Sequence, residues 1–227
     1  TIIRYSRSFG DHFSMAIAAE MPEVSATYGN TFAPINQRMP DFPMYVQYNW
    51  GRRANSHVRV TGVLRNMYYH NLTANKNYSE FGWGVQLSGN INIGRWVDLY
   101  MNGVYGRGIT PYINDLMGTN YDFTYDPKEP TRLQTLPMWG WQAAAQVNIM
   151  PNKLWVAGGY SEVCLEKENG YLAKNQYHKG QYIFGNAFYN INRDFTLALE
   201  YLYGSRKNMD NEKGSANRLS LMVQYNF

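Results

Sequence analysis

The amino-acid sequence predicts an all-β fold, specifically a transmembrane antiparallel up-and-down β-barrel. Three observations support this prediction: apolar and polar residues alternate up to the last residue, the composition is poor in charge and rich in aromatic residues, and the connections are alternately short and long. A barrel wall meets lipid on its outer face and water inside, so its strands alternate in polarity. The soluble alternative is a β-sandwich, whose half-buried strands also alternate.

The alternation is clearest in residues 217–227. One face of this expected strand is apolar and carries Leu219, Leu221, Val223, Tyr225 and Phe227. The opposite face carries Arg218, Ser220, Met222, Gln224 and Asn226. Terminal residues of soluble proteins are usually poorly ordered, whereas the aromatic girdle of a membrane barrel lies where its strands end.

The composition is typical of a barrel wall rather than of a soluble enzyme. Aromatic residues make up 16% of the 227 residues and charged residues only 17%, against roughly 25% charged residues in an average soluble domain. No run approaches the roughly 18 apolar residues of a membrane-spanning helix. A single cysteine, Cys164, excludes an internal disulfide framework. The basic residues form no cluster, so we expect no nucleic acid partner despite a net charge of +4.

Glycine and proline bound the expected strands in the first half of the chain. Gly10, Gly51 and Gly94 predict tight turns, since glycine tolerates positive φ. Several prolines between residues 21 and 41 predict a loop, because proline cannot pair in a sheet interior. Alternation predicts strands at residues 3–6, 13–20, 44–49, 58–65, 83–88 and 97–102.

Polar segments separate the expected strands in the second half. Residues 107–137, 166–175 and 205–215 are rich in charged, asparagine or glycine residues and predict loops. Asn152 and Asn192 mark short turns. Strands are predicted at residues 139–148, 155–163, 181–190, 195–203 and 217–227. The whole chain therefore holds about eleven strands, near the length of roughly nine to eleven residues that crosses a bilayer when tilted.

The connections between these strands sort by length. Short ones are expected near residues 10, 51, 94, 152 and 192, and long ones near residues 30, 73, 120, 170 and 210. Short turns on one rim and long loops on the other are the asymmetry of an outer-membrane barrel. An odd strand number puts the two ends of the chain at opposite rims, whereas a complete barrel has an even number. We therefore expect residues 1–227 to be a single barrel domain that lacks at least one amino-terminal strand, unless the count is wrong by one.

Two blocks of sequence resemble the DcaP-like porin family of Gram-negative outer membranes. Residues 62–69 are Gly-Val-Leu-Arg-Asn-Met-Tyr-Tyr, and residues 82–89 are Gly-Trp-Gly-Val-Gln-Leu-Ser-Gly. The segments 98–100, 104–109 and 112–115 share this character, so the resemblance covers about residues 45–115. It implies a trimeric outer-membrane porin of about sixteen strands, which admits small anionic solutes such as dicarboxylates. The chain would correspond to the carboxy-terminal two-thirds of that barrel.

Arginines on the polar faces of the expected strands are candidates for the pore lining. They are Arg4, Arg59, Arg65 and Arg218. A charge on the lipid face near the midplane costs about 2–4 kcal/mol, so we expect these side chains to face water. Guanidinium groups bind carboxylates in bidentate fashion and favour anions in a pore. The alternative is that each arginine pairs with a luminal Glu20, Asp98 or Glu200 and only holds the wall.

The longest connection, residues 107–137, is a candidate constriction loop. Its charged candidates are Asp115, Asp122, Asp126 and Arg132. We expect this loop to fold inward and narrow the pore, because long loops in compact folds are usually functional. Capping the barrel and contacting a neighbouring subunit are the alternatives.

The sequence contains no motif for a catalytic nucleophile and no spacing typical of metal ligands. Ser56 and His57 are adjacent and therefore point to opposite faces of a strand, and the four histidines are far apart in sequence. We expect no enzymatic activity, no cofactor and no metal site. The predicted function is diffusion of small hydrophilic, preferentially anionic solutes through a homotrimeric porin embedded in outer-membrane lipid. The alternatives are a barrel enzyme acting on lipid and a narrow structural or adhesive barrel.

Overall fold

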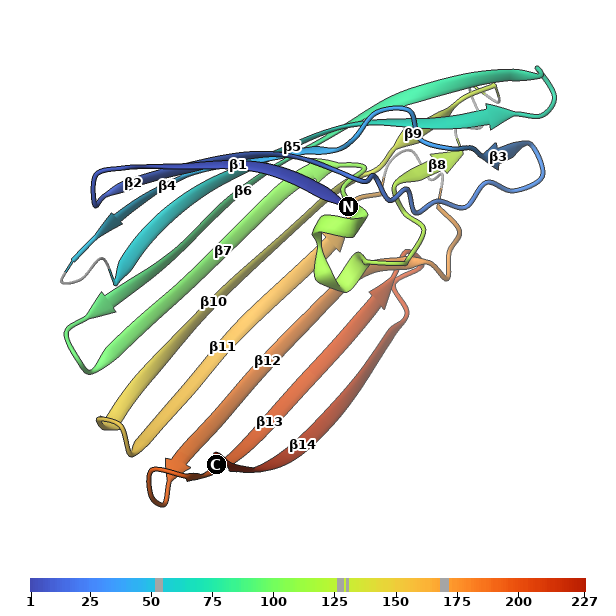
Figure 1. The fold of residues 1–227 in the computed structure, drawn as a ribbon. Helices are drawn as coiled ribbons and strands as arrows, with labels where there is room; N and C mark the ends of the chain where they lie inside the picture. The colour runs from blue at the N-terminus through green and yellow to red at the C-terminus, as the bar shows by residue number, and fades with distance from the viewer. Residues whose placement is uncertain (52–54, 126–128, 130, 168–171) are drawn as a thin grey trace.

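The computed structural model describes residues 1–51, 55–125, 129, 131–167 and 172–227. Its main feature is a single antiparallel sheet in which eleven strands follow one another in chain order (Figure 1). These strands are β1 (Ile2–Phe9), β2 (Phe13–Glu20), β4 (Phe42–Trp50), β5 (Ser56–Asn71), β6 (Lys76–Ile93), β7 (Val97–Arg107), β10 (Pro137–Met150), β11 (Leu154–Leu165), β12 (Tyr177–Asn190), β13 (Phe195–Asn208) and β14 (Lys213–Tyr225). The predicted up-and-down arrangement is confirmed.

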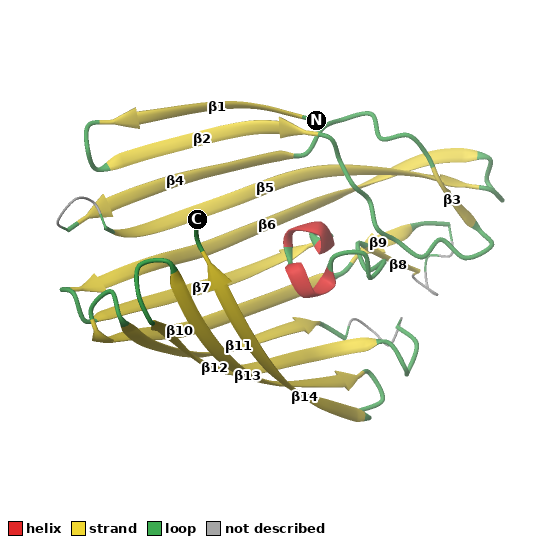
Figure 2. Ribbon diagram, turned by 60° about the horizontal axis from the view of Figure 1, so that its bottom comes forward, coloured by secondary structure: helices red, strands yellow, loops and turns green. Residues whose placement is uncertain are grey.

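The sheet curls into a deep trough whose concave side is visible in Figure 2. β1 pairs only with β2, and β14 pairs only with β13, so within the described residues each edge strand keeps one open edge. None of the helices in the described residues is long and apolar enough to cross a membrane.

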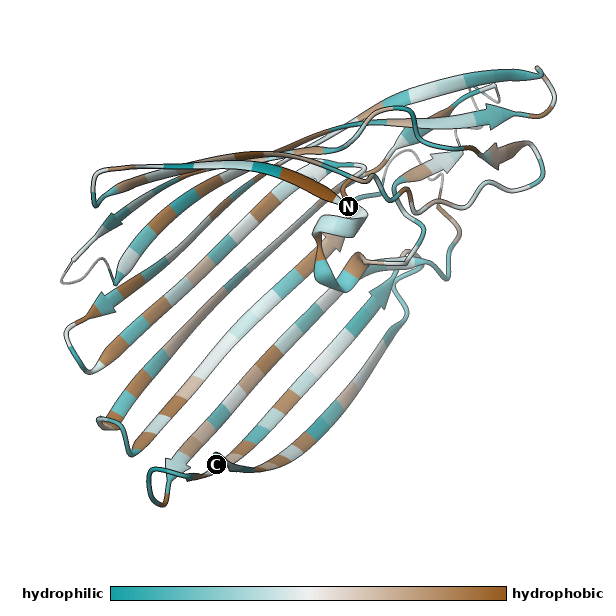
Figure 3. Ribbon diagram, viewed as in Figure 1, coloured by the Kyte–Doolittle hydropathy of each residue, from teal (hydrophilic) through white to brown (hydrophobic). Residues whose placement is uncertain are grey.

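The strand registers place the alternating residues on two opposite faces. On the concave face, a row of polar side chains runs from strand to strand in direct register: Ser14, Gln47, Arg59, Ser88, Asn102, Gln142 and Ser161. On the convex face, Leu219, Leu221 and Val223 are 71%, 75% and 60% exposed. Bands of opposite hydropathy accordingly alternate along the strands in Figure 3. This two-faced sheet is the arrangement that period-2 alternation predicts.

Two connections expected to be long are tight turns. Residues 72–75 join β5 to β6, and residues 209–212 join β13 to β14. Asn75 and Asn211 adopt φ angles of 49° and 75° there, a conformation that asparagine tolerates better than most residues. The polar residues on either side of these turns, 70–71, 76–77 and 213–215, belong to the ends of β5, β6 and β14 at the rim, so the prediction of long loops is wrong. Residues 205–208, likewise predicted as loop, belong to β13.

The segment 21–41 also contains a short strand, β3 (Phe32–Pro34), which pairs with β5 outside the main path of the sheet. Proline is tolerated here because β3 is a short edge strand. The prediction of a pure loop over residues 21–41 is therefore wrong at these three residues.

Candidate functional site

The connection between β7 and β10, residues 108–136, lies on the concave face of the sheet and is called the inner loop below. It holds two single 3-10 turns, η2 (Thr110–Tyr112) and η3 (Asn114–Leu116), and a small hairpin of β8 (Phe123–Tyr125) and β9 (Leu133–Thr135). Figure 2 shows the helical turns inside the curve of the sheet. The chain enters this loop at Gly108, which has a φ of +62°. Glycine adopts this left-handed conformation at little cost because it has no Cβ.

Glycines of the wall make room for the inner loop. Ile109 is fully buried, and a Cβ on Gly84 or Gly106 would lie 2.9 or 2.7 Å from its Cδ1 atom. A side chain on Gly84 would therefore press on Ile109 of the loop, whereas one on Gly106 would also meet the Trp83 carbonyl oxygen of the wall. Gly84 belongs to the Gly-Trp-Gly block at residues 82–84, so one physical role of this block is to seat the loop on the wall. Ile113 and Leu116 extend the same apolar cluster to Leu136 and Met138.

A buried arginine ties the inner loop to the wall. Arg65 in β5 is only 1% exposed. Its Nε donates to Asp41 Oδ2 at 2.9 Å, and its Nη1 donates to Asp122 Oδ1 at 3.1 Å. Nη1 also donates to the Gly108 carbonyl at 2.5 Å, and Nη2 donates to the Glu23 carbonyl. One guanidinium thus joins three segments of the chain.

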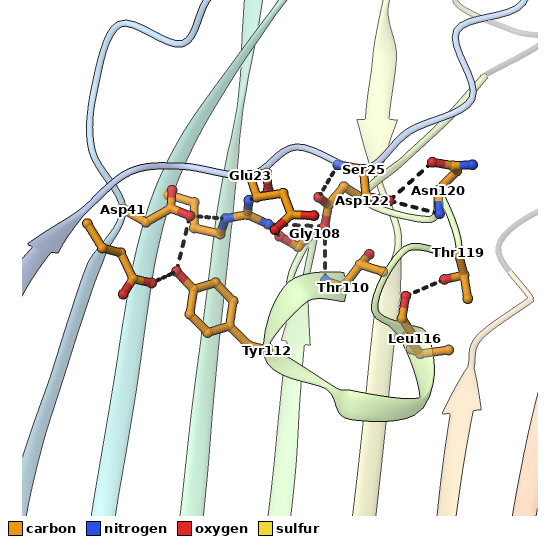
Figure 4. Close-up of polar contacts among 12 residues, drawn as sticks. Glu23, Ser25, Asp41, Gly108, Thr110, Tyr112, Leu116, Thr119, Asn120 and Asp122 are labelled. Atoms are coloured by element: carbon orange, nitrogen blue, oxygen red, sulfur yellow. Dashed lines mark hydrogen bonds and ion pairs between the residues drawn. The ribbon is translucent and has the colours of Figure 1, made fainter. Parts of the chain in front are cut away.

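The two carboxylates of this cluster are bonded further (Figure 4). Asp122 accepts hydrogen bonds from the backbone amides of Thr110 and Ser25, both at 2.9 Å. The Tyr112 hydroxyl donates its proton to Glu20 Oε1 and also lies 3.1 Å from Asp41 Oδ2. Burial, together with the hydrogen bond to Glu20, raises the pKa of Tyr112 above its usual value, so its hydroxyl stays protonated as a donor. The cluster therefore fixes the inner loop, the segment before β4 and the wall relative to one another.

The four predicted pore-lining arginines all lie on strands, and their side chains share the concave face but differ in surroundings. Arg65 is buried beneath the inner loop and presents no charge to solvent. Arg218 lies opposite Leu202, and its Nη2 is 3.2 Å from Glu200 Oε1, which is the wall-holding pairing considered above. Arg4 is exposed and lies opposite Ala18.

Arg59 has a different environment from the other three. Its Nε donates to Gln47 Oε1 at 2.6 Å, and its guanidinium lies 4.5 Å from the centre of the Tyr45 ring. In the ranges that the structure describes, no carboxylate lies within ion-pair distance of Arg59. The partners described for the Arg59 guanidinium are therefore neutral, and its positive charge is not neutralised by a carboxylate in the described part of the chain.

The charged residues of the predicted constriction loop lie in different places. Asp122 is buried against Arg65, whereas Asp115 in η3 lines a cavity of about 590 Å³ between the inner loop and the wall. Burial raises the pKa of Asp115 above its usual value. Arg132 lies at the rim, with Nη2 2.9 Å from Glu80 Oε1. Asp126 falls outside the described residues.

Sequence reasoning missed Arg206, Asp41 and Tyr112. Arg206 lines a second cavity, of about 540 Å³, together with Asp115 and Arg218. Arg206 was missed because the strand was predicted to end at residue 203, whereas β13 extends to Asn208. Following the alternation two residues at a time through Gly204 to Arg206 would have placed Arg206 on the same face as Leu202. Asp41 and Tyr112 carry no local signal, since their partners come from distant segments.

The histidines do not form a recognisable catalytic arrangement. His178 Nδ1 lies 2.8 Å from the Leu165 carbonyl and 3.9 Å from Sγ of Cys164, which is only 6% exposed. A nucleophile needs access to substrate and a base that is oriented toward it, so this pair does not favour the enzymatic alternative. Among the described residues, no group of three or more His, Cys, Asp or Glu side chains is arranged to hold a metal ion.

The fold and the inward-folded loop define the architecture of a porin-type β-barrel wall. No protein-family model and no curated protein matches the chain. Among solved structures, the outer membrane channel DcaP of Acinetobacter baumannii is similar with a TM-score of 0.83 and 19% sequence identity, over 100% of this chain and 62% of that one.

Two further solved structures share the architecture. An anion-selective porin from Comamonas acidovorans has a TM-score of 0.57 at 10% identity, covering 99% of this chain and 57% of its own. A loop-deleted OmpT, an outer membrane protein of Vibrio cholerae, has a TM-score of 0.58 at 13% identity, covering 99% and 62%. The predicted likeness to DcaP-like porins is thus confirmed at the level of the fold, and the chain spans less than two thirds of the length of each of these proteins.

Proposed function

We propose that this chain forms part of the wall of an outer-membrane porin of a Gram-negative bacterium, through which small hydrophilic solutes diffuse. The observation that carries the proposal is the two-faced sheet: polar side chains run in register along its concave face, while its convex face is apolar and exposed. A membrane barrel needs this arrangement, because lipid lies outside and water inside. Transport then follows the solute gradient and needs no cofactor or catalytic step.

The width of the complete barrel decides between a channel and a filled structural barrel. Eleven strands already form an open trough, and the outer edges of β1 and β14 are unpaired within the described residues. We propose that further strands close the sheet to about sixteen, a number that leaves an aqueous channel. Three such barrels would assemble as a homotrimer, which is what the resemblance of residues 45–115 to DcaP-like porins implies.

A preference for anions, including dicarboxylates, is supported by the charges on the concave face. Arg59 lacks an acidic partner among the described residues, and Arg206 lines one cavity together with Arg218. Guanidinium groups bind carboxylates in bidentate fashion, so two of them at one cavity suit a solute with two carboxylates. One solved porin of similar architecture is described as anion-selective.

The inner loop is proposed as the constriction of this pore. Its turns η2 and η3 stand on the concave face, and Tyr112, Asn114 and Asp115 line the cavity beside the wall. The Arg65 cluster would keep this constriction in place during solute passage. Arg65 and Asp122 then act as positioning residues, whereas Asp115 and Arg206 meet the solute. Arg218 lines the same cavity and is also paired with Glu200.

Planar-bilayer conductance of the full-length protein under a tenfold KCl gradient tests this function. We expect discrete steps of conductance and a reversal potential of the sign that anion preference gives. Absence of conductance from folded protein would overturn the porin proposal in favour of a structural barrel. Conductance with cation preference would retain the porin and overturn the proposed role of the arginines.

A further inference from the structure

Three lysines lie in direct register on the convex face of the sheet. Lys179 in β12 pairs with Lys207 in β13, and Lys207 pairs with Lys213 in β14. Neighbouring strands are about 4.8 Å apart, so the three positions span about 10 Å. Like charges directly opposite each other destabilise a sheet. This row therefore needs a compensating negative charge.

The chain itself supplies only part of that charge. Lys179 Nζ lies 2.7 Å from Glu162 Oε1. The other carboxylate oxygen of Glu162, Oε2, accepts hydrogen bonds from the Tyr160 hydroxyl and from Gln181 Nε2. Among the described residues, no ion pair involves Lys207 or Lys213. The acidic residues of the adjoining turn, Asp210 and Glu212, bond within the turn or are exposed.

The position of the lysines along the wall indicates what covers them. On the convex face of β13 and β14, the register runs from the pair Leu199 and Leu221, through Tyr201 and Tyr203, to Ser205 and finally Lys207. Lys207 lies about 13 Å beyond Tyr203 along the strand. The order from apolar to aromatic to hydroxyl to cationic matches the order met from the bilayer interior to the lipid headgroups.

The lysine row also lies at the correct rim for an outer-leaflet contact. It is at the end of the strands opposite the carboxy-terminus, on the same side as the inner loop (Figure 1). In outer-membrane barrels the longer loops face outward from the cell, and the longest connections of this chain, residues 21–41 and 108–136, leave the sheet at this rim. A cavity of about 530 Å³ adjoins the row, and its lining includes all three lysines together with Gln181, Ser205, Ser215 and Arg206. Amide and hydroxyl groups beside ammonium groups are suited to phosphate oxygens.

We propose that the row Lys179, Lys207 and Lys213 binds the phosphate groups of a phosphorylated glycolipid in the outer leaflet of the membrane. The site rests on the proposed function, because it requires the convex face to meet lipid. It adds to that function a fixed lipid ligand on the convex face of the wall, opposite to the face that lines the pore. Glu162 competes with the ligand for Lys179 and thereby limits its affinity.

Binding of diphosphoryl lipid A to the full-length protein in neutral detergent, measured by native mass spectrometry, tests the proposal. The double variant Lys207→Gln with Lys213→Gln is expected to bind at least about tenfold more weakly, the loss expected for two basic side chains at a lipid surface. Glu162→Gln is expected to bind at least as tightly as the unchanged protein. Lys76→Gln at the same rim and Lys153→Gln at the opposite rim are the matched controls and should bind normally.

The outcomes separate this proposal from the porin function. Unchanged lipid binding by the double variant, with controls also unchanged, overturns the lysine site whether or not the protein conducts. Displacement of the lipid by millimolar inorganic phosphate, with equal binding of monophosphoryl and diphosphoryl lipid A, would also overturn it, since the ligand would then be free phosphate. Normal lipid binding by a protein that shows no conductance would remove the porin proposal and leave the lipid site intact.

Discussion

Arg65 Nη1 lies 3.1 Å from Asp122 Oδ1, and both side chains are completely buried between the wall and the inner loop. The two residues are 57 positions apart in the chain. Their contact makes the inner loop part of the wall rather than a free segment within the lumen. Because the pair is buried and extensively hydrogen-bonded, losing one partner would leave an uncompensated charge in the interior.

Replacing Arg65 with alanine should therefore release the inner loop and destabilise the protein. We expect a loss of about 3–5 kcal/mol in the free energy of unfolding, since Asp41 and Asp122 would both lose their charged partner. Urea unfolding of refolded protein measures this loss, and single-channel recordings should show larger and noisier conductance. Arg59→Ala is the control, because Arg59 has only neutral partners; an equal loss of stability in both variants would contradict the role given to Arg65.

Replacing Arg65 with lysine should rescue only part of this loss. Lysine keeps the charge but cannot present the planar fork that reaches Asp41, Asp122 and the Gly108 carbonyl together. The expected stability lies between those of the alanine variant and the unchanged protein, as measured by the same urea titration. Full recovery would mean that charge alone fixes the loop.

Replacing Gly84 with valine should displace the inner loop through contact with Ile109. The added Cβ would lie 2.9 Å from Ile109 Cδ1, and overpacking of this kind typically costs about 1–3 kcal/mol. Gly103→Val is a matched control, because a Cβ there meets no atom within 4 Å. Thermal or urea unfolding compares the two variants, and equal effects would mean that the glycine does not seat the loop.

Replacing Arg59 with glutamine should reduce the anion preference while leaving the fold intact. The side chain presents a positive charge to the concave face with no carboxylate beside it in the described part of the chain. We expect the reversal potential under a KCl gradient to move toward zero. Arg132→Gln, which removes a rim charge already paired with Glu80, should shift the potential less; the opposite order would place the selective charge at the rim.

Asp115 should make the selectivity depend on pH. Burial raises the pKa of this carboxyl above its usual value, so it takes up a proton at a higher pH than an exposed aspartate does. As the pH falls through that pKa, a negative charge beside Arg206 and Arg218 is lost and anion preference should increase. Reversal potentials measured from pH 7 downward test this, and Asp115→Asn should show the increased preference throughout without this pH step.

The same rise in pKa has a consequence for stability with a defined sign. A carboxyl whose pKa is higher in the folded than in the unfolded protein binds its proton more strongly when folded, so the folded state gains stability as the pH falls through that range. Asp115→Asn should remove this contribution to the pH dependence of unfolding. If the variant retains the full dependence, another group is responsible.

The sequence by itself determined the strands, their two faces and the likeness to a porin family. Alternation is a local property with a period of two residues, so residues such as Leu219, Leu221 and Val223 reveal their common face without knowledge of the fold. Alternation failed to mark the polar strand ends on either side of the turns 72–75 and 209–212, because polar strand ends at a rim have the same composition as loops. Local composition cannot separate these two cases.

Only the tertiary structure decided which charges face solvent. Arg59 and Arg65 occupy the same face of the same strand, yet Arg65 is buried under the inner loop and Arg59 is not. The difference comes from partners that the curled sheet brings together across long stretches of chain, such as Asp41 and Asp122 for Arg65. The register of three lysines across β12, β13 and β14 arises in the same way, because strand pairing, not sequence spacing, sets which side chains lie opposite one another.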